Sequence, residues 1–452
     1  MSAASKRAFE EILNKSKRKK SVAKSVTGMD SFFESHPAFE SIGMDEAQSE
    51  EDHALQRQYR PLFGKEGINE NPIGCHPDFR KLQGTSDTEY HFICSLFIDI
   101  KNSTRLSFLY PLEDVVSIKN SILKAAAEIV RCLDGYVHRF MGDAVLAYFG
   151  GLNHSKDDSI INAINCASLL ESLMTGTIIP VLETQGYKGS DLGFRIGLDY
   201  GPTEEVLWAS YGSAQVNEVT ATSFYVDVAS KLQSMARKNQ AMLGESIISD
   251  IDFPSEYLNK KTVINNGVRE EVEHLNKVYT NRQGLAFRYK VREMNHAAYR
   301  DLLPFSATEK AGFNSSSAIG NDKIDFRCFT VTNGTRHPYA SVSKVLSKKQ
   351  KLKFKLTILK SLADYEEYPL VVQFTKRNYG KEAALGSQAG VFPRDIERVT
   401  LPASNVTSVF EPAQIIEFDE TTEFRGLHTM EAEVKNSTGE VIYRHKIGIY
   451  IE

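Results

Sequence analysis

The stretch "HRFMGDAVLAYF", from His138 to Phe149, is the part of the sequence from which the fold can be worked out. Two apolar runs, "YVHRF" and "AVLAYF", stand on either side of a short turn, and this pattern predicts a hairpin of two antiparallel strands. The turn carries Gly142 and Asp143, and Arg139 lies four residues before the aspartate. Charged residues at the turn of an otherwise apolar hairpin indicate that the turn binds a ligand, and the identity of this ligand decides the function.

On both sides of this hairpin the sequence alternates between strands and helices. The expected elements, in chain order, are a strand at 92–100, a helix at 111–135, the hairpin, a helix at 156–174, a strand at 192–201 and a helix at 223–238. The run "EVLWAS" is expected to pair with the strand before it as a second hairpin. The order β-α-ββ-α-β predicts an α+β fold with a ferredoxin-like or palm-type sheet.

Composition divides the chain into four parts. Residues 1–88 form a helical and irregular lead-in, residues 89–293 carry the alternating strands and helices, and residues 294–320 suit a linker. From 321 to 452 the helical period is absent, and runs such as "KLKFKLTI" alternate between apolar and polar residues. We therefore expect the α+β domain to be followed by a small all-β sandwich.

Charge and cysteine content narrow the setting. The 452 residues carry a net charge of −4, so no overall positive field attracts DNA or an anionic membrane. The five cysteines are dispersed without CxxC spacing, which argues against disulfides and zinc and for a reducing cytoplasm. No signal peptide is apparent and no apolar run approaches spanning length, so we expect a cytoplasmic protein without a membrane span. The basic run "KSKRKK" (15–20) favours a solvated helix face over an electrostatic contact site.

Two aspartates form the first chemical constellation. Asp99 stands at the end of the strand at 92–100, and Asp143 stands in the neighbouring turn, so both could face one spot. Paired carboxylates with oxygen-only surroundings suit Mg²⁺ or Mn²⁺, which bridge triphosphate oxygens. Each aspartate taken alone is more often structural, as a turn or capping residue.

A small polar segment after Asp99 forms the second constellation. Asn102, Ser103 and Thr104 open a short helix, where exposed amides and hydroxyls can cradle phosphate. Ordinary N-capping explains these three residues equally well.

Together, these features resemble the class III nucleotide cyclase domain. The match runs through "FIDIKNST", "HRFMGDAVLAYF", "FRIGLDYGP" and "FYVDVASKLQ", within residues 89–291. The resemblance implies a head-to-tail homodimer with active sites at the interface, where two Mg²⁺ or Mn²⁺ ions assist conversion of a nucleoside triphosphate to a 3′,5′-cyclic nucleotide. The positions that match the family motif are Asp99, Asp143 and the Ile100 carbonyl as metal ligands, Arg139 and Thr220 at the base, Asp227 at the ribose, Lys231 at the transition state and Lys277 at the triphosphate.

Four positions depart from the family pattern. Asn102-Ser103 replaces the usual Gly-Phe pair, Asp227 replaces an asparagine, and Lys231 replaces an arginine. The aspartate lacks an amide donor, and the lysine lacks the planar fork of arginine. These departures support an alternative of a different class, an inactive module that binds nucleotide and signals by contact. A diguanylate cyclase is disfavoured, because its Gly-Gly-Asp/Glu-Glu-Phe hairpin is absent.

The base can be inferred from the chemistry of Arg139 and Thr220. A donor beside an acceptor-capable hydroxyl suits a ring-nitrogen acceptor next to an exocyclic amine, the edge that both adenine and cytosine present. Uracil is disfavoured, although a hydroxyl can also donate. Arginine is longer than the lysine usual for adenine, which is consistent with a smaller ring. Tyr110 could narrow the pocket further, but it is more often a core residue.

The C-terminal part resembles the sensor domain attached to bacterial defence cyclases and related nucleotidyltransferases. Glu423, Gly426 and His428 carry this looser match, and turn or sheet chemistry explains them equally well. A cyclase joined to such a domain is similar to the pyrimidine cyclases of the Pycsar antiphage system, whose product activates a separate effector protein. The leading hypothesis is therefore conversion of CTP to cyclic CMP and pyrophosphate, with UTP and then ATP as the alternative substrates.

Overall fold

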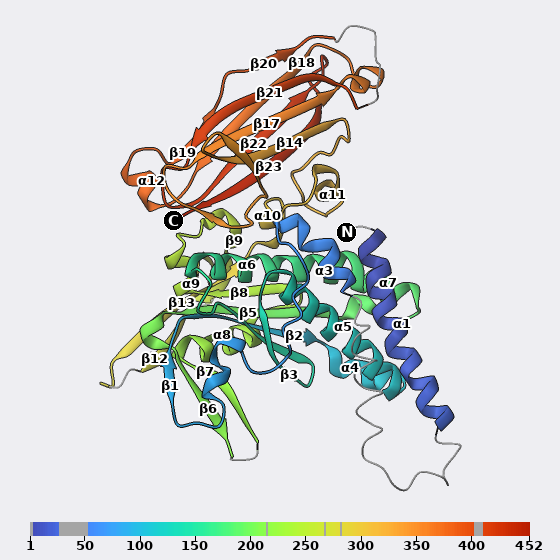
Figure 1. The fold of residues 1–452 in the computed structure, drawn as a ribbon, viewed down its shortest axis with the longest axis vertical. Helices are drawn as coiled ribbons and strands as arrows, with labels where there is room; N and C mark the ends of the chain where they lie inside the picture. The colour runs from blue at the N-terminus through green and yellow to red at the C-terminus, as the bar shows by residue number, and fades with distance from the viewer. Residues whose placement is uncertain (1–2, 27–52, 214–215, 266–267, 281–282, 402–409) are drawn as a thin grey trace.

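The computed structural model describes residues 3–26, 53–213, 216–265, 268–280, 283–401 and 410–452, and shows two units stacked end to end (Figure 1). Layered helices and strands make up the lower unit in Figure 1, and an all-β sandwich makes up the upper unit. The long N-terminal helix α1 (Ala3–Val26) lies along the side of the lower unit.

An eight-stranded sheet forms the centre of the lower unit. Its order is β12-β13-β8-β5-β2-β4-β3, with β9 paired to β13. Its strands are β2 (Ile93–Lys101), β3 (Tyr136–Met141), β4 (Ala144–Phe149), β5 (Gly193–Gly201), β8 (Gln240–Gly244), β9 (Leu258–Asn259), β12 (Leu275–Thr280) and β13 (Ala286–Met294). Strand β2 has neighbours on both sides and is covered on both faces, which explains its continuous apolar run.

Helices cover the two faces of this sheet. The helices are α4 (Ser103–Leu109), α5 (Leu112–Cys132), α6 (Lys156–Leu173), α7 (Ile179–Thr184), α8 (Phe224–Met235) and α9 (Glu245–Asp250). Leu96, Ile98 and other alternate residues of β2 pack in one core with α5 and α6, while α8 packs on the opposite face. The chain order of strands and helices confirms the predicted α+β palm-type fold.

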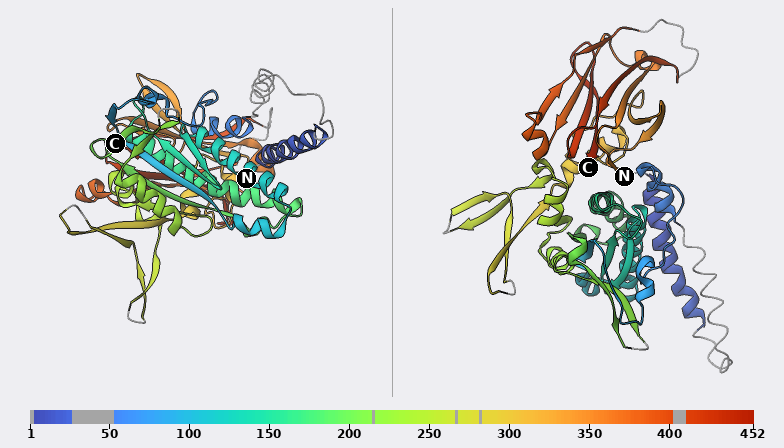
Figure 2. Two further views of the ribbon diagram at one scale, coloured as in Figure 1. Left: turned by 90° about the horizontal axis from the view of Figure 1, so that it is seen from below. Right: turned by 60° about the vertical axis from the view of Figure 1, so that its left-hand side comes forward.

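The predicted pairing of "EVLWAS" was wrong. This run is β6 (Leu207–Gly212), and it pairs with β7 (Asn217–Thr222) and β1 (Thr88–Tyr90) in a separate three-stranded sheet. Pro202 and the 3₁₀ turn Thr203–Glu205 follow β5 directly, so the chain leaves the central sheet before β6 begins. Figure 2 shows the β6–β7 hairpin projecting from the body of the unit.

One apolar helix requires a correction to the expectation that no run reaches spanning length. The continuous helical stretch Lys156–Thr184 is long and apolar enough to cross a membrane by length and composition alone, although 78% of its most apolar window is buried in the structure. Helix α6 contacts the sheet, α5 and α10, and also β16 of the sandwich. Because neighbours surround it, it is apolar on all sides in the manner of a core helix.

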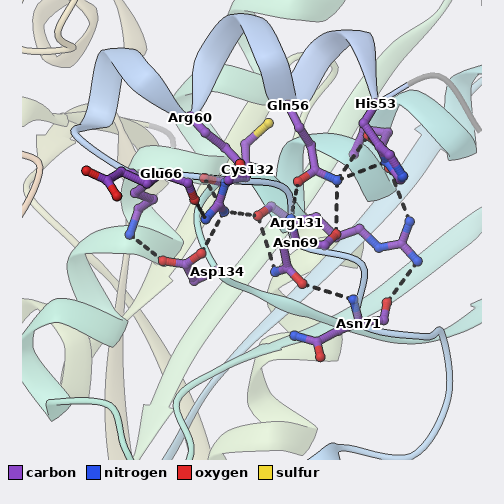
Figure 3. A network of polar contacts seen from close by, with 12 residues as sticks. His53, Gln56, Arg60, Glu66, Asn69, Asn71, Arg131, Cys132 and Asp134 are labelled. Atoms are coloured by element: carbon purple, nitrogen blue, oxygen red, sulfur yellow. Dashed lines mark hydrogen bonds and ion pairs between the residues drawn. The ribbon is translucent and has the colours of Figure 1, made fainter.

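The N-terminal lead-in is tied to the lower unit by apolar and polar contacts. Phe9 and Leu13 of α1 are buried in the core that contains α5. Figure 3 shows the polar network at α3 (Ala54–Tyr59), where Arg60 donates to the Arg131 carbonyl at 2.9 Å and to Asp134 at 2.6 Å. Burial raises the pKa of Asp134, but Lys65 and Arg60 outweigh it and hold the pKa below its usual value.

The upper unit is a sandwich of two sheets. One has the order β15-β14-β17-β21 and the other β16-β23-β22-β18-β19, with β20 paired to β18. The strands are β14 (Ile324–Thr332), β15 (Thr335–Tyr339), β16 (Val345–Leu346), β17 (Lys351–Leu359), β18 (Leu370–Asn378), β19 (Gly390–Pro393), β20 (Glu397–Val399), β21 (Pro412–Thr421), β22 (Gly426–Lys435) and β23 (Val441–Ile451). The alternating side chains of β17 place one apolar row in the core between the sheets, as the sequence pattern predicts.

The segment 294–320, for which a linker was expected, is packed between the two units. It contains α10 (His296–Arg300) and α11 (Ala307–Ala311), and Tyr299 is fully buried. The Tyr299 hydroxyl donates to Asn165 of α6 at 2.9 Å, and the Asn165 amide donates to the Val342 carbonyl at 2.8 Å. A chain of buried hydrogen bonds therefore joins the lower unit to the sandwich.

Candidate active site

The two aspartates from the sequence constellation lie at the same end of the β2–β4 pair. Asp99 stands opposite Ala144 in the antiparallel ladder, and Asp143 is the residue before Ala144. The Ile100 amide donates to the Asp143 carbonyl at 3.1 Å, which holds the turn against β2. Gly142 has a φ of +67°, a conformation that glycine adopts at little cost in this two-residue turn.

Each carboxylate has a polar partner that orients it. Ser103, the first residue of α4, donates to the Asp143 carboxylate. Arg195 of β5 faces Asp99 across the ladder and donates to one of its oxygens through Nε at 2.8 Å and through Nη2. Sequence reasoning missed Arg195, because the register of β5 against β2 is what brings the two residues together.

The donor set fits a hard divalent cation. Two carboxylates and the Ile100 carbonyl offer oxygen atoms, the kind of ligand that Mg²⁺ and Mn²⁺ prefer. In the described part of the chain no three His, Cys, Asp or Glu residues gather into a metal-binding group. The protein would therefore supply only part of a coordination sphere at Asp99 and Asp143, which suits an ion that also binds water and substrate phosphate.

The three residues expected at the phosphate lie at the start of α4, a helix of seven residues. Asn102 has a φ of +65°, and its amide donates to the Asp191 carbonyl at 2.8 Å. Ser103 is buried with its hydroxyl on Asp143, whereas Thr104 is exposed. The Asn102 and Ser103 side chains thus have protein partners in this structure, and Thr104 faces solvent.

Arg139 and Thr220 lie in one region but do not bond to each other. Arg139 on β3 forms an ion pair with Glu218 on β7 and donates to His138 Nε2 at 3.1 Å. The Thr220 hydroxyl, two residues along β7, shares a 3.1 Å hydrogen bond with the Tyr148 hydroxyl. Sequence reasoning missed Glu218, although its spacing from Thr220 places both residues on one face of a strand.

Asp227, Lys231 and Lys277 form a separate group. Asp227 and Lys231 are exposed one turn apart on α8, and the Lys231 ammonium lies 5.2 Å from the Tyr279 ring centre. Lys277 lies two residues before Tyr279 on β12, at the edge of the sheet opposite β3. Among the described residues, no hydrogen bond or ion pair joins these three side chains to Asp99 or Asp143. These side chains stand on α8 and on the edge strand β12, and not on the β2–β4 pair that carries the two aspartates.

A buried aspartate lies beneath α8. Asp199 in "FRIGLDYGP" is completely buried and accepts hydrogen bonds from Ser246 at 2.5 Å and from the Tyr289 hydroxyl at 2.8 Å. Burial raises the pKa of Asp199 to about 7, although these donors act in the opposite direction. Its carboxyl therefore holds a proton under mildly acidic conditions, which distinguishes it from an ordinary surface aspartate.

The sandwich residues singled out from the sequence lie where the two units meet. Gly426, with a φ of +114°, begins β22, and the buried His428 is hydrogen-bonded through Nε2 to the Phe424 carbonyl at 2.8 Å. Burial lowers the pKa of His428. Glu423 is exposed, and nearby Arg425 donates to the Asp250 carbonyl of the lower unit at 2.8 Å.

Comparison with known proteins finds similar proteins for both units. The model of the adenylyl/guanylyl and SMODS C-terminal sensor domain matches residues 305–452. A cytidylate cyclase from Escherichia coli is 38% identical over 89% of this chain and 88% of its own length. A cytidylate cyclase from Staphylococcus aureus is 34% identical over 88% of this chain and 87% of its own length.

A solved structure resembles part of the chain. The adenylyl cyclase CyaB from P. aeruginosa aligns with 46% of this chain and 95% of its own at 18% identity, with a TM-score of 0.37. The identity to the two curated relatives extends over both units and nearly the full length of each relative. The chain therefore belongs to the cytidylate cyclase family.

Proposed function

We propose that this protein converts CTP to 3′,5′-cyclic CMP and pyrophosphate. The observation that carries the proposal is the β2–β4 pairing that brings Asp99 and Asp143 together, in a chain that has two cytidylate cyclases among its curated relatives over most of its length. Phosphoryl transfer of this kind depends on positioning and on charge stabilisation, and the site offers groups for both.

Asp99, Asp143 and the Ile100 carbonyl would hold Mg²⁺ or Mn²⁺, two ions for each site. When bound, such ions supply charge neutralisation at the phosphates and lower the pKa of the attacking 3′-hydroxyl. The protein's own groups prepare this arrangement. The Ser103 hydroxyl orients Asp143, and the Arg195 guanidinium orients Asp99.

Arg195 also adds positive charge where phosphate would lie. Its guanidinium uses Nε and Nη2 on Asp99, and a guanidinium has five donors, so three remain for phosphate oxygens. Exposed Thr104 at the start of α4 is a further donor at the same end of β2. We assign the triphosphate to this region, with Asn102 and Ser103 as supporting backbone positions and Lys277 as a more distant contact.

The active unit is proposed to be a homodimer with sites between subunits. Asp227 and Lys231 are exposed on α8 and, within the described ranges, bond to neither aspartate, so a second copy is the natural source of these groups for each site. Exposed apolar side chains on the two helices that follow β2 support this arrangement: Phe108 on α4 is 86% exposed, and Leu112 and Val116 on α5 are each 66% exposed. Exposed apolar side chains gathered in one place favour burial against a partner.

We propose that the two units have separate functions. Residues 89–293 would carry the cyclase, residues 1–88 would brace it, residues 294–320 would join it to the sandwich, and residues 321–452 would act as the sensor. The match to a C-terminal sensor domain and the direct contact of Arg425 with Asp250 support this division. Cyclic CMP would then act as a second messenger on a separate effector in cytoplasmic antiphage defence, for which the five free cysteines indicate a reducing setting.

A product assay with the four ribonucleoside triphosphates tests the proposal. The full chain with Mn²⁺ is expected to form a cyclic product from CTP at a higher kcat/KM than from UTP, ATP or GTP. Asp99→Asn and Asp143→Asn should lower turnover at least a hundredfold with the fold retained, whereas Glu417→Gln, in a surface ion pair with Arg336 of the sandwich, should not change it. Nucleotide binding without pyrophosphate release would instead identify a non-catalytic module, and preference for another base would overturn the choice of CTP.

A further inference from the structure

The ion pair between Arg139 and Glu218 places a donor and an acceptor side by side. Arg139 Nη2 contacts the Glu218 carboxylate and also lies 3.1 Å from His138 Nε2. The Glu218 side chain remains 43% exposed and the Arg139 side chain 36% exposed, so the pair forms part of the surface. Arg139 Nε is buried and has no hydrogen-bond partner among the described residues. Because both side chains are partly exposed, the pair can also form hydrogen bonds with a ligand.

The His138 ring fixes one side of this pair. His138 Nδ1 lies 3.1 Å from the Gly74 carbonyl, so this nitrogen carries the proton and Nε2 is left to accept from Arg139. Burial lowers the pKa of His138, which favours the neutral ring that this arrangement needs. Arg139 is thus held between a neutral acceptor and a carboxylate.

Thr220 is less available than its sequence position suggests. Its hydroxyl shares a hydrogen bond with the Tyr148 hydroxyl at 3.1 Å. Tyr148 is completely buried, and burial raises its pKa to about 12, so it remains a neutral phenol at physiological pH. A hydroxyl with a fixed protein partner discriminates weakly between an amine and a carbonyl, because a rotation reverses its role.

We propose that Glu218, and not Thr220, accepts the hydrogen bond from the exocyclic amine of the base, while Arg139 donates to the adjacent ring nitrogen. This inference rests on the proposed cyclase function and adds the residue that selects the base. A carboxylate can only accept hydrogen bonds and carries a full negative charge. It would bind the 4-amino group of cytosine and repel the 4-carbonyl of uracil, so one side chain both attracts the substrate and rejects its nearest analogue.

The magnitude of the effect follows from the charge on the acceptor. Hydrogen bonds to charged groups contribute about 1.5–3 kcal/mol, which corresponds to roughly 10- to 150-fold in an equilibrium constant. We therefore expect loss of the Glu218 charge to lower the ratio of kcat/KM for CTP to that for UTP by at least about tenfold. Glutamine can present either its oxygen or its amide nitrogen, so Glu218→Gln removes the preference without removing the side-chain volume.

The test crosses two proteins with two substrates. Steady-state kcat/KM is measured for the wild type and Glu218→Gln with CTP and with pyrimidin-2-one riboside triphosphate, which lacks only the 4-amino group. The kcat/KM of the wild type is expected to fall at least about tenfold from CTP to the analogue without the amine, and that of Glu218→Gln to fall less than threefold. Equal losses in both proteins would overturn the proposal. UTP is added as a third substrate, and its use should improve relative to CTP in the variant.

A purely structural role for Glu218 has a different signature. If Glu218 only steadied Arg139, Glu218→Gln would lower kcat/KM for all three substrates by one common factor and leave their ratios unchanged. Glu218→Asp retains the carboxylate and is expected to keep more of the CTP preference than Glu218→Gln. Glu417→Gln is the matched control, since it removes another arginine-paired carboxylate far from this region.

The outcome is separable from that of the proposed function. A wild type that prefers another triphosphate would refute the assignment to CTP, yet the ratio of amine-bearing to carbonyl-bearing bases would still report on Glu218. A folded, dimeric wild type that turns over none of them would refute the cyclase proposal. Equilibrium binding of CTP and UTP in the presence of Ca²⁺ would then give the same ratio, and an unchanged ratio in Glu218→Gln would reject the role of Glu218.

Discussion

Replacement of the buried Asp199 by asparagine should remove one pH-dependent contribution to the stability of the lower unit. Asp199 is completely buried, and its pKa in the folded protein is about 7, compared with an ordinary value of 3.8. Between these two values the folded protein binds a proton that the unfolded chain does not, so the free energy of unfolding falls as the pH rises. Asparagine has no proton to lose, so this contribution disappears in Asp199→Asn.

The magnitude follows from the difference in pKa. One pKa unit corresponds to about 1.4 kcal/mol, so the full difference amounts to about 4 kcal/mol, of which about 3 kcal/mol falls between pH 5 and pH 8. This is a large share of the stability of a typical domain, which is about 5–15 kcal/mol. The free energy of unfolding of Asp199→Asn minus that of the wild type should therefore rise by about 3 kcal/mol between pH 5 and pH 8, whatever the absolute stability of the variant.

Urea unfolding followed by tryptophan fluorescence provides the measurement. Trp208 is the single tryptophan in the sequence, and it is buried against Phe79 in the lower unit, so its emission reports on this unit and not on the sandwich. Unfolding midpoints are compared at pH 5, 6, 7 and 8 for the wild type, Asp199→Asn and the exposed-loop control Asp87→Asn. A pH slope in Asp199→Asn equal to that of the wild type would refute the assignment of this proton to Asp199.

Two further predictions concern assembly and the lead-in. Asp143→Ala and Lys231→Ala chains should each be inactive, and an equimolar mixture after exchange should recover about a quarter of the wild-type rate, because half of the dimers then carry one intact site of two. No recovery in a mixture shown to contain heterodimers would reject shared sites. Arg60→Met should lower the free energy of unfolding by about 3 kcal/mol, since it removes the buried guanidinium that bonds Asp134 and the Arg131 carbonyl and leaves them with Lys65 and Asn69. Trp208 fluorescence measures this loss, and a change below 1 kcal/mol would show that the Figure 3 network contributes little.

Several features could be predicted because their signals are local. The hairpin at His138–Phe149 is encoded by two apolar runs and a Gly-Asp turn, and the structure contains it as β3 and β4. Apolar residues at helical spacing predicted α5, and strict alternation predicted β17. Each of these patterns lies within one element, and its period is set by backbone geometry alone.

The errors came from contacts that no local pattern contains. The run "EVLWAS" has the composition of a strand, but its pairing with β7 and β1 depends on the turn at Pro202 and on segments far along the chain. Helix α6 is apolar enough for a membrane span because the sheet, neighbouring helices and the sandwich all cover it. Its composition could be read from the sequence, but the identity of its surroundings could not.

Some residues of the candidate site could likewise be predicted from local sequence, whereas others could be found only in the structure. Sequence alone identified Asp99, Asp143, Arg139 and Thr220, because motif spacing and residue chemistry are properties of the chain itself. Only the tertiary structure placed Arg195 on Asp99, from 96 residues away, and Glu218 on Arg139, from 79 residues away. Strand register places Arg195 opposite Asp99, and a shift of one residue would send these side chains to opposite faces, whereas Glu218 meets Arg139 through a contact between two separate sheets. The type of chemistry could thus be predicted from the sequence, whereas the partners that orient each charged group depend on pairings between distant segments, and these exist only in the folded protein.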